Sequence, residues 1–331
     1  MPLHEAHYQH WDGVHEGIWM RRWVIARNGL GACLKTRSLR IVMTGCWMTA
    51  LIMTAFLFFL GQLLVPDSMV SNWVTQMNSE LQTFFEMLTS WLRLHPELSV
   101  STTQNVLFYF YCVYLMPMSI FALGMALPML ITRDLASSAI VIYSSKAVSR
   151  GDYLIGKFGT AFGLMTLTWL GPVCAAWFLS NLLAPDWKFF WHARVPLFHV
   201  LLFGLPSMMI LCCLALGVSA FSSREKATPA LWFTWWAVGW MIQNIALHTI
   251  PMLQHVSFFY DLKQWGLAVF QLDTNLHTAQ TGIPVFGDML KNMRPETRAA
   301  IENPRLAGAI LALALMVAAA GGIVRKRVKP E

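Results

Sequence analysis

Long runs without a charged residue divide the chain into predicted membrane spans. A bilayer core about 30 Å thick needs roughly 20 apolar residues per helix, and six uncharged runs are long enough. None alternates apolar and polar positions as barrel strands do, and backbone polar groups in lipid need internal partners, so we expect an all-α polytopic fold. The six runs are Ile41–Val65, Asn105–Ile131, Phe158–Pro185, Val195–Ser223, Ala227–Tyr260 and Leu306–Val324.

The fifth run is longer than one crossing needs, so we place its span at Ala230–Ile250 and the remainder near the outer interface. Four tryptophans gather in its inner half, more densely than an aromatic belt requires, which leaves a helix contact or a substrate-facing wall as alternatives. They are Trp232, Trp235, Trp236 and Trp240.

The basic residues predict the orientation of this six-helix fold. With the N-terminus in the cytoplasm, 16 of the 24 Lys and Arg residues fall on the cytoplasmic side, as the positive-inside rule favours. Both termini are therefore expected in the cytoplasm. The expected parts are a tail with an interface helix at 1–40, a transmembrane domain at 41–324, a basic tail at 325–331, a cytoplasmic loop at 132–157, and external segments at 66–104 and 251–305.

Composition supports a membrane protein and excludes several other classes. Charged residues make up 12% of the chain, against about 25% in soluble domains. The net charge of +7 is explained by membrane orientation, so no nucleic-acid partner is needed. None of the six cysteines lies in an expected external segment, which makes a disulfide framework improbable.

The first membrane-associated element is an amphipathic helix over 18–37. Apolar residues follow one stripe of this helix and polar residues the opposite one, as in helices that lie along a membrane surface. We expect four of its residues to lie at the interface, namely Trp19, Arg22, Trp23 and Arg27.

Motifs for catalysis in this chain are weak. Gly151–Lys157 matches G-x-x-x-x-G-K, but Phe158 stands where Ser or Thr would hold magnesium. The expected spans carry no acidic residue, which argues against a proton-driven carrier and an aspartyl protease. The N-terminal histidines are better read as a flexible polar tail than as a metal site; they are His4, His7, His10 and His15.

The segment between the second and third spans has a more specific pattern. It reads Arg-acidic, small residues, an apolar run, a Ser-Lys and a Ser-Arg pair, then Asp-Tyr-apolar-apolar-Gly-Lys. This pattern resembles the corresponding loop of ABC-transporter permeases of the exporter (type-two) family, although Ala147 replaces the usual Pro and Leu135 a second acidic residue. The residues that carry it are Arg133, Asp134, Ser145, Lys146, Arg150, Asp152, Tyr153, Gly156 and Lys157.

The resemblance implies a permease subunit of an ATP-driven exporter in a bacterial cytoplasmic (inner) membrane. This chain would then have no catalytic residue, metal or cofactor of its own. ATP and magnesium would bind a separate ABC ATP-binding subunit, docked at the interface helix and the 132–157 loop. The other implied partners are membrane lipid, a second permease copy or paralogue, and an extracytoplasmic accessory protein.

Two other classes remain open at this stage. A haem-binding membrane anchor of a redox enzyme would use His199 and His248 as candidate ligands, because ionisable residues in or near spans are functional candidates by default. A membrane scaffold would use the external segments to hold an extracytoplasmic partner. The substrate is not named by the sequence, since Met-rich and aromatic spans suit lipids, apolar peptides, drugs or plain lipid exposure.

Overall fold

The computed structural model describes residues 17–328 except 67, 75, 77, 139–148, 185–186, 247–249 and 283–291. Within these residues all regular elements are helical, as expected for an all-α fold. The first half comprises α1 (Ile18–Lys35), α2 (Arg37–Leu63), α3 (Met69–Val74), α4 (Ser79–Leu94), α5 (Pro96–Leu127), the π-helical η1 (Pro128–Thr132) and α6 (Arg133–Ala136). The remainder comprises α8 (Arg150–Met165), the π-helical η2 (Thr166–Leu170), α9 (Gly171–Leu182), α10 (Trp187–His192), α11 (Arg194–Phe221), α12 (Ala227–Ala246), the 3-10 helix η3 (Pro251–Val256), α13 (Phe258–Val269), α14 (Leu272–Gly282), α16 (Pro295–Glu302) and α17 (Leu306–Arg327).

Among the described residues, five helical stretches are long and apolar enough to span a membrane, so the chain has the make-up of a multi-pass integral membrane protein. They match the first four predicted spans and the sixth. The predicted fifth span corresponds to α12, which is not among the five because tryptophan, glutamine and asparagine lower its hydropathy. A sixth crossing by α12 stays a prediction. The five stretches are Arg37–Leu63, Pro96–Ala136, Arg150–Leu182, Arg194–Phe221 and Leu306–Arg327.

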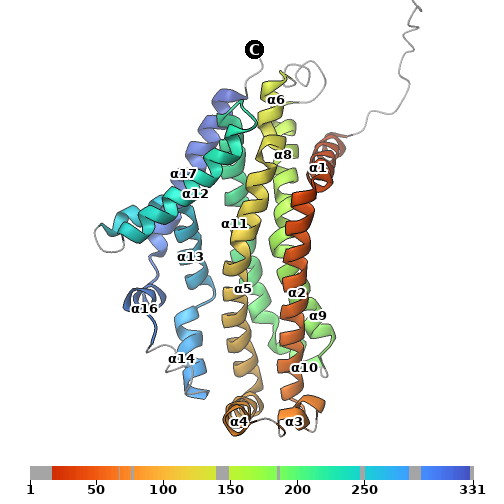
Figure 1. Ribbon diagram of the computed structural model, residues 1–331, viewed down its shortest axis with the longest axis vertical. Helices are drawn as coiled ribbons and strands as arrows, with labels where there is room; N and C mark the ends of the chain where they lie inside the picture. Colours follow the sequence, from red (N-terminus) through yellow and green to blue (C-terminus); the bar gives the residue numbers. More distant parts are fainter. Residues whose placement is uncertain are drawn as a thin grey trace, which may run out of the picture.

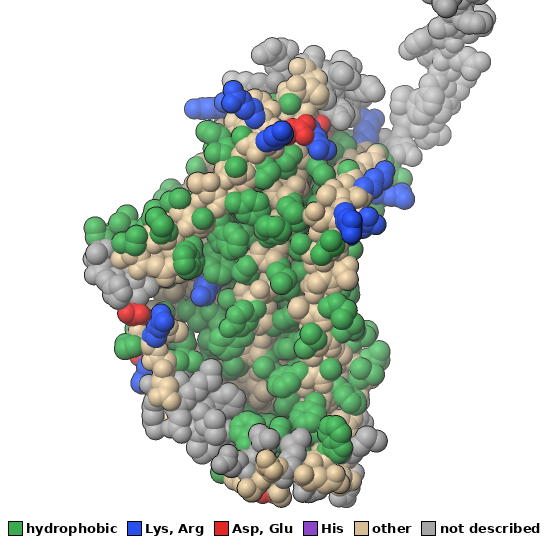
Figure 2. All heavy atoms as spheres, in the orientation of Figure 1, with side chains coloured by type: hydrophobic (Ala, Val, Ile, Leu, Met, Phe, Trp, Pro, Cys, Tyr) green, Lys and Arg blue, Asp and Glu red, His purple; other side chains and the backbone are tan. Residues whose placement is uncertain are grey.

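The long helices lie side by side in one bundle (Figure 1). The end that carries α1, α6 and the last turn of α17 is called the α1 end, and the end that carries α3 and α4 is called the α4 end. In the bundle α11 packs against α5 and α17, and α2 packs against α9. Basic side chains gather at the α1 end, while apolar side chains cover most of the face below it (Figure 2).

Small residues allow the helices to approach closely, as in other membrane bundles. A Cβ added to Gly217 of α11 would lie 2.5 Å from the Cβ of Ala320 on α17. A Cβ on Gly124 of α5 would lie 2.6 Å from the Trp232 ring, which is fully buried and donates its Nε1–H to the Ile120 carbonyl. Trp232 is therefore a contact between α12 and α5, whereas Trp240 is exposed.

A π-helical segment interrupts the third span where proline removes a backbone donor. Pro172 leaves the carbonyl of Thr168 without its usual partner. The Ser119 hydroxyl of α5 donates to that carbonyl at 3.0 Å, and the Trp47 indole of α2 donates to the Leu167 carbonyl at 3.0 Å. Neighbouring helices thus satisfy the freed groups, which is how membrane helices tolerate proline.

Several helices extend beyond the apolar runs that predicted them. The third span begins at Arg150, so the last part of the expected 132–157 loop is helical. Its charged residues can enter a helix because each finds a partner at the α1 end. Within 66–104 the chain forms the short helices α3 and α4, and Pro96 begins the next helix, α5.

The segment after α12 packs into the bundle. α13 packs between α17, α12 and α11. Its Phe258 and Leu262 side chains are buried, and a Cβ on Gly239 of α12 would lie 3.2 Å from the Ser257 backbone. The buried side chains of α13 are both apolar and polar, since Asp261 and Gln264 are buried as well.

Candidate functional site

A cluster of charged residues at the α1 end joins α6 to α8. The Lys157 ammonium lies 2.7 Å from Asp134 Oδ2, and the Tyr153 hydroxyl donates to the same oxygen at 2.6 Å. Lys157 also donates to the Met129 carbonyl at 3.2 Å. The side chains of Asp134 and Lys157 are only 16% and 11% exposed, so this ion pair faces the protein and screening by solvent is weak.

A second ion pair joins α1 to the first turn of α8. The Arg22 guanidinium donates from Nε to Asp152 Oδ1 at 2.6 Å. The Ser149 hydroxyl accepts from the Asp152 backbone N–H at 3.2 Å, which is an N-cap for α8. Asp152 therefore contacts the interface helix through its side chain and takes part in the N-cap of the third span through its backbone N–H.

Two further arginines extend these links to α12 and α17. Arg150 donates to the carbonyls of Val324 and Arg325 at 3.1 and 2.7 Å, in the last turn of α17, where a cation complements the helix dipole. Arg133 pairs with Glu225, two residues before the start of α12, at 3.0 Å. Both of those side chains are about half exposed, so this pair contributes little to stability.

A buried polar joint, which sequence reasoning missed, lies beside this network. Ser219 of α11 accepts from the backbone N–H of Ile131, within the π-helical segment η1, at 2.8 Å and donates to the carbonyl of Leu127, just before that segment, at 2.8 Å. Thr132 shares hydroxyl contacts with Ser219 and Thr228. All three hydroxyl residues are fully buried. Pro128 within an apolar run is the sequence signal that marked this place, because π-helical segments arise where the regular ladder is broken.

Glycines bring α1 and α8 together. A Cβ on Gly29 would lie 2.3 Å from Thr160 Oγ1, and a Cβ on Gly156 would lie 2.6 Å from Ile25 Cβ. Gly159 and Gly163 face Ala26 and Leu30 in the same way. Gly156 thus has a definite role, which is to let the interface helix touch the third span.

The predicted interface residues divide between two faces of α1. Arg22 is half-buried in the ion pair with Asp152, and its guanidinium lies 4.6 Å from the centre of the Trp19 ring. Trp19, Trp23 and Arg27 are exposed. Exposed indole rings such as those of Trp19 and Trp23 are what a helix at a headgroup layer presents.

Seven of the nine predicted coupling residues can be placed. Ser145 and Lys146 lie outside the described residues. The other seven come together at the α1 end, in contacts that link α1, α6, α8, α12 and α17. They are Arg133, Asp134, Arg150, Asp152, Tyr153, Gly156 and Lys157.

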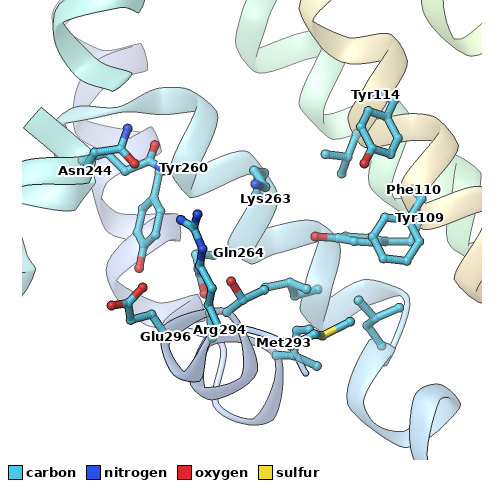
Figure 3. Close-up of a pocket in the computed structure, with 17 residues that line it drawn as sticks. Tyr109, Phe110, Tyr114, Asn244, Tyr260, Lys263, Gln264, Met293, Arg294 and Glu296 are labelled. Atoms are coloured by element: carbon cyan, nitrogen blue, oxygen red, sulfur yellow. The ribbon is translucent and has the colours of Figure 1, made fainter. Parts of the chain in front are cut away.

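A cavity of about 580 Å³ lies nearer the α4 end, between α5, α12, α13 and α16 (Figure 3). Its apolar walls include Phe110 and Leu267, and its charged groups are Lys263, Arg294 and Glu296. In Figure 3, Asn244 and Tyr260 lie on one side of the space and Tyr109 lies on the other. Lys263 and Arg294 lie between them. Figure 2 shows the same region as a hollow in an apolar face with a basic side chain inside it.

Beside the cavity, the fully buried Asp261 contacts His255. His255 Nδ1 lies 2.5 Å from Asp261 Oδ1, and Oδ2 of Asp261 has no partner among the described residues. Burial raises the pKa of Asp261 to about 8. Burial, with a smaller effect of the Arg305 charge, lowers the pKa of His255. Both directions favour a neutral pair near pH 7, with the carboxylic acid donating to the imidazole.

Of the two histidines in the haem-anchor hypothesis, only His199 is among the described residues. His199 Nδ1 lies 2.8 Å from Asn105 Oδ1, and its ring packs edge-on against Phe270. His248 and the N-terminal histidines lie outside the described residues. The haem hypothesis therefore gains no support from the geometry of His199.

No protein-family model matches the chain, and no curated protein matches it. The family resemblance thus stays a hypothesis based on residues 132–157 and on the layout of the spans.

Proposed function

We propose that this chain is the transmembrane subunit of an ABC-type exporter, driven by ATP hydrolysis in a separate subunit. The observation that carries the proposal is that seven predicted coupling residues lie together at the α1 end, in separate contacts that cross-link α1, α6, α8 and α17. Transmission of force requires such cross-links, because an inward push on one element must move several spans together. ATP and magnesium would be held by the partner subunit.

The orientation in the proposal rests on charge. The α1 end carries most of the basic residues, so the positive-inside rule places it in the cytoplasm. Both termini then face the cytoplasm, α12 supplies a sixth crossing, and α1 lies along the inner leaflet. The ATP-binding subunit would dock at this same end.

The contacts refine the expected roles. Asp134, Asp152 and Lys157 face inward and pair with one another or with α1, so we assign them to holding the joint rather than to touching the partner. Arg133, about half exposed, is better placed to reach a partner. Nucleotide binding would bias one of two bundle arrangements through this joint and move the substrate site from one side to the other.

The test is an affinity pull-down of the tagged full chain from native membranes in mild detergent, followed by mass spectrometry. We expect an ABC ATP-binding subunit in near-equal amount. Recovery of a flavin or iron–sulfur subunit instead would contradict the proposal and favour a redox anchor. Recovery of an extracytoplasmic protein without an ATPase would favour the scaffold.

A further inference from the structure

Among the described residues that line the cavity between α5, α12, α13 and α16, more carry a positive than a negative charge. Lys263 and Arg294 face one carboxylate, that of Glu296. Lys263 has no ion-pair partner among the described residues, and its nearest aromatic contact places its ammonium 5.7 Å from the centre of the Phe259 ring. A largely buried cation without a counter-ion is unfavourable unless a ligand supplies one.

Burial lowers the pKa of Lys263, as expected for an ammonium that lacks a nearby anion. The acid two residues before it does not compensate, because Asp261 is directed to His255. The positive charge of Lys263 is therefore available to a molecule that enters the cavity.

The rest of the lining is suited to a molecule with an apolar body. Phe110, Val113, Leu267 and Ile301 form apolar walls. Polar groups that can orient a ligand lie among them, including the Gln243 carbonyl oxygen, which is buried and has no partner among the described residues. A cavity of about 580 Å³ lies in the size range of sites for drug-sized ligands.

We propose that this cavity binds an amphipathic anion, whose acidic group pairs with Lys263 and Arg294 and whose apolar body lies against the α5 and α13 side chains. The ligand class is an acid with a carboxylate, sulfate or phosphate on an aliphatic or aromatic body. This proposal rests on the proposed function for its meaning as a substrate site. Binding itself does not depend on ATP.

The test uses two matched fluorescent probes, dansyl-labelled undecanoic acid and its methyl ester. Their binding is measured with the full chain in lipid nanodiscs. We expect the acid to bind more tightly than the ester. Lys263→Met should weaken binding of the acid about tenfold or more, the range for a charge-assisted contact, and should leave binding of the ester unchanged.

Two controls separate charge from folding. Lys263→Arg keeps the charge and should retain preference for the acid. Arg298→Met removes a cation from the outer face of α16, where Arg298 pairs with Glu302 outside the cavity, and should have no effect. Retained ester binding in Lys263→Met reports an intact cavity.

Two results would overturn the proposal: equal affinity for acid and ester in the unmodified chain, or unchanged preference for the acid in Lys263→Met. Two competitors, a long-chain phosphate monoester and a phospholipid with the same headgroup charge, identify the source of the ligand. Displacement of the probe by the monoester indicates a free amphiphile, and displacement by the phospholipid indicates a membrane lipid. Displacement by either supports the anion site. If the pull-down finds no ATPase but the acid binds through Lys263, only the proposed function fails. If the pull-down finds the ATPase but the chain binds the acid and the ester equally, only the proposed ligand class fails.

Discussion

The α1 end and the cavity treat charge in opposite ways. At the α1 end, Asp134, Asp152 and Arg150 each have a partner on another element. In the cavity nearer the α4 end, Lys263 has no ion-pair partner among the described residues. The side-chain oxygen of Gln243 is buried there and has no hydrogen-bond partner among those residues.

This difference separates a mechanical site from a binding site. Charges that are paired across helices fix the relative positions of those helices, because breaking such a pair leaves a charge uncompensated. Unpaired polar groups in a cavity do not hold the fold together, and they stay available to an outside molecule. The predictions below test whether the α1 end is a rigid joint and whether the region of the cavity contributes less to stability.

The largest effect is expected from Asp134→Asn. The amide keeps the size of the side chain but leaves Lys157, which is 11% exposed, without its carboxylate. We expect a loss of about 3 kcal/mol in stability, measured as a lower thermal unfolding midpoint of the chain in detergent.

The matched control for Asp134→Asn is its neighbour Arg133→Gln. The Arg133 pair with Glu225 is about half exposed on both sides, so its loss should change stability by less than about 1 kcal/mol. Equal midpoints for the two variants would show that the α1 end is not a rigid joint.

Two glycines of α1 provide the second comparison. A Cβ on Gly29 would lie 2.3 Å from Thr160 Oγ1, whereas Gly31 has nothing within 4 Å. Gly29→Ala should therefore push α1 away from α8 at a cost of about 1 to 3 kcal/mol. Gly31→Ala should be neutral or stabilise by up to about 1 kcal/mol, because alanine favours helix.

Maleimide labelling of Cys33 measures this displacement of α1, because that thiol is fully buried in the bundle. Labelling should be faster in Gly29→Ala and unchanged in Gly31→Ala. Labelling at the same rate in both would mean that close contact of α1 with α8 is not required.

The smallest effect concerns pH and the segment beside the cavity. Burial raises the pKa of Asp261 to about 8, so between its ordinary value of 3.8 and 8 the folded state binds more protons and stability falls as pH rises. The lowered pKa of His255 acts oppositely and only below its ordinary value of 6.5. Between pH 6.5 and 8, Asp261 therefore acts without a contribution from His255.

Over that window the unfolding midpoint should fall, because stability decreases by up to about 1.4 kcal/mol per pH unit. Asp261→Asn should remove this slope, and comparison with the unmodified chain cancels the titration of other groups. A slope that persists in Asp261→Asn would show that the carboxyl group is ionised in the folded chain.

The sequence predicted the spans well because absence of charge is a local property. Five charge-free runs coincide with helices that are apolar enough to cross a membrane. It placed Arg150–Lys157 in the cytoplasmic loop before the third span, whereas these residues form the first turns of that span, because the partners of their charges come from α1, α6 and α17. The π-helical segments were also missed, although Pro128 and Pro172 mark them.

The residues of the α1 end were easier to predict from the sequence than those of the cavity. The residues of the α1 end were found through a family resemblance, but their inward direction and the Ser219 joint depend on packing between distant helices. The cavity was missed, because Lys263 and Asp261 looked like ordinary charges of an external segment. A lone lysine among aromatic residues at 258–270 was the available signal.

The most direct test of coupling between the two ends is ATP hydrolysis by the purified complex, measured with and without dansyl-labelled undecanoic acid. We predict that the acid changes ATP turnover in the unmodified complex and that Asp134→Asn retains binding of the acid but loses this response. An unmodified complex that binds the acid without any change in turnover, or an equal response in Asp134→Asn, would contradict the account.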